Sequence, residues 1–117
     1  MKDYAAMSDG QIAEEVAKFI ELGDRKQKGE GTLYVKNNVW TRFDPCNNPA
    51  DAWPIISENK ISTMWMTSEK EWCAWSEGDL GEGAWYWENS PDYYFSCTSQ
   101  LRAAMIVFLM MKESEND

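Results

Sequence analysis

Apolar residues near the start of the chain recur with the spacing of one helical face, at Ile12, Val16, Phe19 and Ile20. Ser8 and Gln11 have the spacing of a capping box, and Gly23 is suited to follow the end of a helix. The pattern predicts an amphipathic helix over residues 9–22. The polar, glycine-flanked stretch 23–31 predicts a loop.

Residues 32–43 alternate on both sides of Asn37-Asn38, a pair that tolerates positive φ, and therefore predict a tight hairpin. In the next segment, Asn48 can cap a helix and Pro49 suits its first position. Because Pro54 lacks an N–H, we expect two short helical turns, or one turn and an irregular stretch, before a strand at 61–66.

The second half predicts a hairpin of residues 70–76 with 83–88 around the acidic loop EGDLGEG, then a strand at 93–97. Thr98 or Ser99 is expected to cap a final helix, LRAAMIVFLMMK, which has nine consecutive apolar residues and must be buried on most sides. The acidic tail 113–117 is expected to fray.

Together these elements predict one α+β domain over residues 1–117. We expect a mostly antiparallel sheet of about five strands, packed by the buried C-terminal helix, with the N-terminal amphipathic helix beside it.

Charge is unevenly balanced, with 20 acidic residues, 11 basic residues and a net charge of -9. This charge disfavours direct nucleic-acid binding through a general basic patch and favours a basic protein partner. The first ten residues, MKDYAAMSDG, lack the apolar run of a signal peptide, so we expect none. The apolar run 103–111 is shorter than the roughly 20 residues of a membrane span, so we expect no contact with a membrane. Cys46, Cys73 and Cys97 have no C-x-x-C spacing and are expected to be reduced, buried thiols.

The chain contains no histidine, which excludes His-dependent nucleophilic and general acid–base catalysis and His-containing zinc sites. The glycines of EGDLGEG stand among acidic residues, which would repel a phosphate. The spacing of these acidic residues does not match a calcium-binding loop. We therefore expect no enzyme, no cofactor and no metal. A hydrolase that uses carboxylates alone is the third alternative.

Seven tryptophans are many for one small core. Trp85 and Trp87 would share one strand face, whereas Trp72 and Trp75 would lie on opposite faces. These side chains are core residues, walls of a stacking site for a planar ring, or parts of a dimer interface.

Three stretches, MSDGQIAEEVA, DPCNNPADAWPIISENKIS and LRAAMIVFLMM, resemble the NinX-like family of small phage and prophage proteins. The resemblance covers most of the chain and is weakest in the tryptophan hairpin. It implies a phage accessory protein in the cytoplasm of the infected bacterium, and it transfers no functional residues.

We expect a binding protein that sequesters a small nucleotide-like signalling molecule, with an anti-defence role and a dimeric state. Its expected ligand-binding residues are Trp40, Arg42, Asn47, Asn48, Asp51, Trp53 and Arg102. For Arg102, a salt bridge to one of the many acids is the alternative.

The alternative function is an acidic inhibitor that masks a basic or nucleic-acid-binding surface of a host protein. Its acidic face would consist of Glu77, Asp79, Glu82, Glu88 and Asp92.

Overall fold

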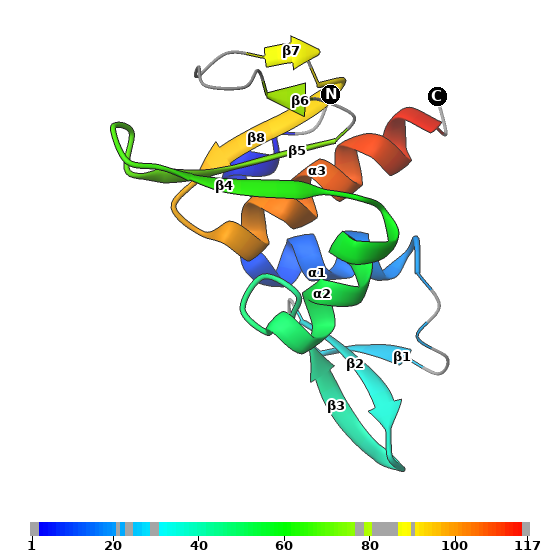
Figure 1. Ribbon diagram of the computed structural model, residues 1–117. Coiled ribbons are helices and arrows are strands. Elements are labelled where there is room, and N and C mark those ends of the chain that lie inside the picture. Colours follow the sequence, from blue (N-terminus) through cyan, green and yellow to red (C-terminus); the bar gives the residue numbers. More distant parts are fainter. Residues whose placement is uncertain are drawn as a thin grey trace.

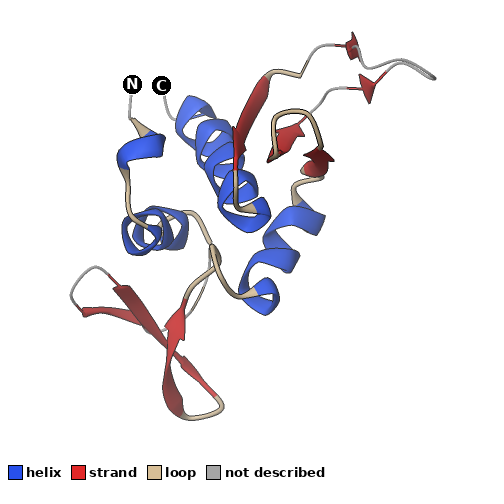
Figure 2. Cartoon of the chain, turned by 90° about the vertical axis from the view of Figure 1, so that its left-hand side faces the viewer, coloured by secondary structure: helices blue, strands red, loops and turns tan. Residues whose placement is uncertain are grey.

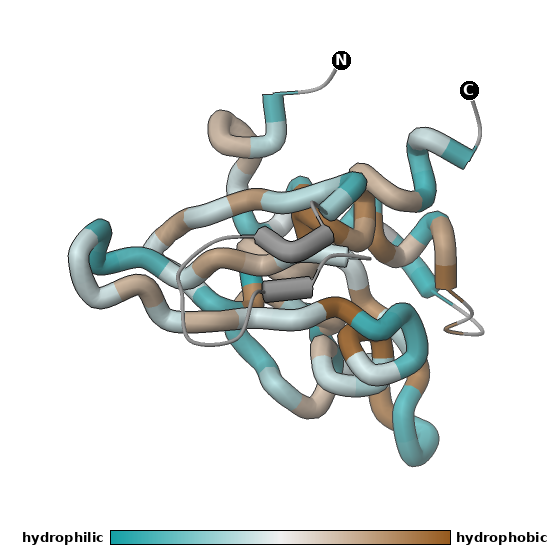
Figure 3. The backbone as a smooth tube through the Cα atoms, turned by 45° about the horizontal axis from the view of Figure 1, so that its top comes forward, coloured by the Kyte–Doolittle hydropathy of each residue, from teal (hydrophilic) through white to brown (hydrophobic). Residues whose placement is uncertain are grey.

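The computed structural model describes residues 3–20, 22, 25–28, 31–76, 79–80, 87–89 and 91–115. The molecule is elongated, with principal extents of 49 × 31 × 26 Å. The C-terminal helix α3 (Gln100–Glu115) lies in its middle, between a sheet on one side and the helices α1 (Asp9–Ala17) and α2 (Pro49–Glu58) on the other (Figure 1). Hydrophobic positions concentrate toward this interior, and the turns at the margins are mostly hydrophilic (Figure 3).

The described strands form two three-stranded antiparallel sheets and a two-stranded ribbon, so the predicted single sheet of about five strands is wrong. The first sheet has the order β1-β2-β3, from Arg25–Lys28, Gly31–Lys36 and Val39–Phe43. The second has the order β4-β5-β8, from Ser62–Met66, Glu71–Ser76 and Tyr93–Cys97. Figure 2 shows the first sheet projecting away from the helices. The α+β class is confirmed.

Several local predictions are confirmed by hydrogen bonds close in sequence. Ser8 and Gln11 form the capping box of α1, but the helix ends at Ala17, earlier than residue 22. Asn37 and Asn38 have φ of 54° and 66° in the turn between β2 and β3, as the tight hairpin requires. A short 3₁₀ helix, η1 (Tyr4–Ala6), precedes α1.

The polar stretch predicted as a loop contains β1, which pairs with β2 from Arg25↔Tyr34 to Lys28↔Gly31. Lysine-rich edge strands are common because charge protects an open edge from pairing with other chains. Strands were predicted from alternating apolar and polar residues, and β1 has no such alternation, so it was predicted as a loop. The predicted helix stop at Gly23 lies outside the described residues.

The segment around Pro54 forms one continuous helix, α2, so the predicted interruption is wrong. Proline removes only the bond to the carbonyl of Ala50, in the second position of the helix. Both residues are exposed, so water can reach that carbonyl. The side chain of Asn48 accepts the N–H of Ala50 at 3.0 Å, which confirms the cap.

The predicted pairing of residues 70–76 with 83–88 is wrong where the structure describes it. Strand β5 pairs with β4 through Trp65↔Trp72 and with β8 through Trp75↔Tyr94. Strand β7 (Trp87–Asn89) pairs with β6 (Asp79–Leu80) in a ribbon on the side of the sheet away from α3 (Figure 1). Residues 81–86, with Trp85, lie outside the described residues.

The core confirms the buried C-terminal helix: residues 103–109 of α3 are at most 1% exposed. Ser99 accepts the N–H of Arg102 and thus caps α3. The helix continues to Glu115, further than predicted. In its last turn Glu113 accepts the Tyr4 hydroxyl at 2.6 Å and Ser114 contacts the Tyr93 hydroxyl at 2.7 Å. No helix in the described part of the chain is long and apolar enough to cross a membrane.

Candidate functional site

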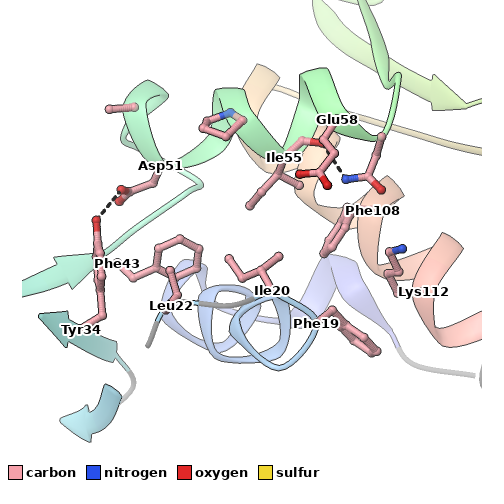
Figure 4. Close-up of a pocket in the computed structure, with 13 residues that line it drawn as sticks. Phe19, Ile20, Leu22, Tyr34, Phe43, Asp51, Ile55, Glu58, Phe108 and Lys112 are labelled. Carbon is pink, nitrogen blue, oxygen red and sulfur yellow. Dashed lines mark hydrogen bonds between the residues drawn. The ribbon is translucent and has the colours of Figure 1, made fainter. Parts of the chain in front are cut away.

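A cleft of about 560 Å³ opens where α2, α3, the first sheet and the segment after α1 meet (Figure 4). Its apolar and aromatic lining comes from elements far apart in the sequence, namely Phe19, Ile20, Leu22, Tyr34, Phe43, Pro54, Ile55 and Phe108. Asp51, Glu58, Asn59 and Lys112 add polar groups. The volume lies in the range of small-molecule sites, which are mostly apolar with a few placed polar groups.

The polar side of the cleft is organised by Asp51, which is buried near the start of α2. One carboxylate oxygen accepts the Tyr34 hydroxyl at 3.3 Å and the other accepts the Asp44 N–H at 2.9 Å. Burial, followed by the charge of Asp51, raises the pKa of Tyr34. Tyr34 therefore remains a neutral hydrogen-bond donor at physiological pH.

The far end of the cleft carries its cation. Lys112 Nζ lies 3.7 Å from a carboxylate oxygen of Glu115 and 5.8 Å from the Phe108 ring centroid. Glu58 is exposed at the rim, and Asn59 donates to the carbonyl of Ile55 at 2.8 Å. Among the described lining residues, two carboxylates face one ammonium group, so the cleft does not have the charge of a polyphosphate site.

Asp51 is the member of the predicted ligand-binding set that lines this cleft. Asn48 is occupied as the cap of α2. Trp53 is 61% exposed on α2, and Trp40 and Arg42 lie on the outer face of the first sheet. The predicted set is thus distributed over separate surfaces.

Arg102 and Asn47 meet at a different place, around Asp9 at the start of α1. Arg102 Nη1 lies 2.7 Å from Asp9 Oδ1, and Asn47 Nδ2 donates to Asp9 Oδ2 at 3.1 Å. Arg102 also donates to the carbonyls of Tyr4 and Met7. The salt-bridge alternative for Arg102 is therefore confirmed, and its guanidinium fastens the N-terminal segment to α3.

This cluster also sets the protonation of its neighbours. Burial favours the neutral form of Asp9, but hydrogen bonds from Arg102 and Asn47 outweigh it and lower the pKa of that carboxyl. Burial, followed by the charge of Asp9, raises the pKa of the Cys46 thiol to about 12. Cys46 and Cys73 are buried and Cys97 is half-buried, all three as free thiols.

The tryptophans with described side chains divide between core and surface. Trp75 is 7% exposed, whereas Trp40, Trp53 and Trp65 are 45%, 61% and 43% exposed. Trp65 packs edge-on against Trp72, with ring centroids 5.6 Å apart. Of the predicted acidic face, Asp92 is exposed, Glu77 and Glu82 lie outside the described residues, and the side chains of Asp79 and Glu88 are not described.

The cleft residues that sequence reasoning missed are mainly Phe19, Ile20, Phe43 and Phe108. Helical or strand periodicity identifies each of them as apolar and inward-facing, but does not distinguish a core position from a cleft wall. Lys112 gives one weak signal, as a cation that follows a long apolar run.

The sequence model of a family described as "Bacteriophage P22, NinX" matches residues 3–112. The chain therefore belongs to this family of phage proteins, as the resemblance of its three stretches implied. A search of curated proteins gave no match.

Proposed function

We propose that the protein is a non-catalytic binding protein that captures a small nucleotide-like molecule in the cleft between α2, α3 and the first sheet. The observation that carries the proposal is the cleft itself, which is about 560 Å³ in volume and combines aromatic walls with a hydrogen-bonding side. Planar rings gain affinity from such walls by stacking and by leaving water.

The polar groups favour recognition of a base or nucleoside more than recognition of phosphates. Asp51 and Glu58 can accept hydrogen bonds from amino groups, and the Tyr34 hydroxyl lies beside Asp51. Lys112 offers one cation, enough for a single phosphate at one end. A ligand with several phosphates would meet uncompensated repulsion from the two carboxylates.

Membership of a phage family supports an accessory role in the cytoplasm of an infected bacterium, where capture of a defence signal would benefit the phage. A dimer belongs to the same proposal because exposed Trp53 and Trp65 are suited to a subunit contact. Light scattering of the purified protein tests the dimer independently of the ligand.

Equilibrium dialysis against nucleosides, mononucleotides and cyclic dinucleotides tests the capture. We expect depletion of at least one compound, recovered unchanged after the protein is denatured. Ala50→Phe, at an exposed position on the cleft wall, should abolish binding by filling the space. Ala6→Phe, at an exposed position outside the lining residues, is the matched control.

Lys112→Ala distinguishes recognition of the phosphate from recognition of the nucleoside. We expect it to weaken binding of the phosphorylated form and to leave the nucleoside unaffected. Failure of every compound to bind, or equal binding by the Ala50→Phe variant, would overturn the proposal. Chemical conversion of a bound compound would place the protein among enzymes.

An acidic inhibitor is the second candidate, and the charge distribution favours it. Outside residues 25–43 the chain carries 19 acidic and six basic residues, a charge of -13. Reversing Asp79, Glu88 and Asp92 to lysine should abolish capture of a basic host protein, and raised salt should weaken it steeply. Capture that withstands both changes would exclude this candidate.

A further inference from the structure

The outer face of the first sheet carries a group of side chains that the cleft does not use. The register places Lys26, Leu33 and Arg42 side by side on this face, and Val35 beside Trp40 in the next row. The opposite face carries Thr32 and Phe43 and packs inward. We call Lys26, Leu33, Val35, Trp40 and Arg42 the basic face.

Charge is strongly segregated between this sheet and the rest of the molecule. Residues 25–43 contain five basic residues and one acidic residue, a charge of +4, whereas the remainder of the chain carries -13. The net charge of -9 is therefore an average over two oppositely charged regions. A local basic surface of this kind attracts anions even on an acidic protein.

The cations of the basic face are held against the sheet. Lys26 Nζ lies over the Trp40 ring, 4.4 Å from its centroid, and Trp40 remains 45% exposed. The Arg42 guanidinium lies across Gly31, so close that a Cβ at this position would stand 2.7 Å from Nη2. Glycine at position 31 thus leaves the space in which this planar group rests on the strand.

We propose that the basic face binds single-stranded nucleic acid. A base stacks on Trp40, Lys26 moves from the ring to a phosphate, and Arg42 holds a neighbouring phosphate. Unpaired bases expose the ring faces that an indole stacks on, whereas a duplex hides them. The carboxylate side chains of an acidic polypeptide satisfy the cations but offer no ring for the exposed indole, whereas every nucleotide carries both a charge and a ring. The proposal is independent of the cleft and of its ligand.

Fluorescence anisotropy of a labelled single-stranded oligothymidylate, measured at low ionic strength, tests the proposal. If about three phosphates are contacted, the logarithm of the affinity should fall with the logarithm of salt with a slope of about -2. Trp40→Ala should weaken binding by a factor of about 10 or more, since it removes one base stack. Arg42→Glu should abolish binding.

Two further variants distinguish the effect of the position of the Arg42 side chain from the effect of the net charge of the protein. Gly31→Ala keeps every charge and displaces only the flexible end of Arg42, so binding should weaken without loss of thermal stability. Lys70→Glu makes the same change in net charge as Arg42→Glu at an exposed position between β4 and β5, and should leave most of the binding intact. The cleft variant Ala50→Phe should bind the oligonucleotide normally.

Three outcomes would overturn the proposal. The first is no binding of single-stranded DNA or RNA at low ionic strength. The second is equal losses from Lys70→Glu and Arg42→Glu, which would show a general charge effect. The third is competition by polyglutamate of the same charge as strong as that of the oligonucleotide, which would identify the face as a site for acidic proteins.

Discussion

The two three-stranded sheets have the same antiparallel topology but different surroundings. One face of β4-β5-β8 is covered by α3, and Ala74 in its central strand is fully buried. The outer face of β1-β2-β3 leaves Trp40 and Val35 exposed. Whether an apolar helix covers a sheet face therefore decides if that face joins the core or stays in contact with solvent.

The largest expected effect is Leu109→Ala in the body of the molecule compared with Val35→Ala on the basic face. Leu109 is fully buried, so its truncation should cost about 2–5 kcal/mol. Val35 is 38% exposed, and its truncation should cost less than about 1 kcal/mol. Urea unfolding measures both, and similar losses would contradict the contrast between the sheets.

Arg102→Met tests whether this residue is structural. It removes the pair with Asp9 and the bonds to the carbonyls of Tyr4 and Met7. We expect a loss of about 2–3 kcal/mol from charged hydrogen bonds. Lys112→Met, on the same helix with a partly exposed ion pair, should cost less than about 1 kcal/mol. An Arg102→Met protein of normal stability would refute the structural role.

Each of the two sheets has a buried hydroxyl group on its inner face, and these two groups allow the inner faces to be compared. Within the described part of the chain, Thr32 Oγ1 and Ser76 Oγ have no hydrogen-bond partner. Thr32→Val in the first sheet and Ser76→Ala in the second should each stabilise the fold by about 1 kcal/mol, because a desolvated polar group is removed. Thermal unfolding checks this, and destabilisation by either change would reveal a partner.

The smallest expected effect concerns pH and Asp9. Its folded pKa lies below the ordinary 3.8, so the ionised carboxyl stabilises the fold above that pH and loses this contribution as the pH falls through the folded value. Asp9→Asn should therefore lower the melting temperature at pH 7, and the difference should shrink below pH 3.8. Asp92→Asn, at an exposed position, is the control. A difference independent of pH would rule out the charge as its cause.

Much of the local structure was predictable from the sequence. The capping box at Ser8, the Asn37-Asn38 turn and the Asn48 cap depend on bonds between residues within four positions of each other. The burial of α3 followed from a run of apolar residues with no polar face. The strand β1 was missed because its pairing, and not its composition, makes it a strand.

The candidate site was predictable only in part. Asp51 was among the expected ligand-binding residues, although its role in the cleft depends on Tyr34 from another element. Arg102 was expected either to bind the ligand or to form a salt bridge, and the sequence could not decide between the two because Asp9 lies 93 positions away in the chain. The pairing of β1 with β2, which was not predicted, places Lys26 and Arg42 on one sheet face with Trp40.

The class of the fold, the caps and turns, and the element that must be buried can all be predicted from the sequence, because these depend on periodicity and on near neighbours. The tertiary structure alone decided how the strands divide into two sheets and which face stays open. It also brought Phe19, Phe43 and Phe108 to one cleft. Such choices depend on contacts between distant segments, which a local pattern allows in many equivalent combinations.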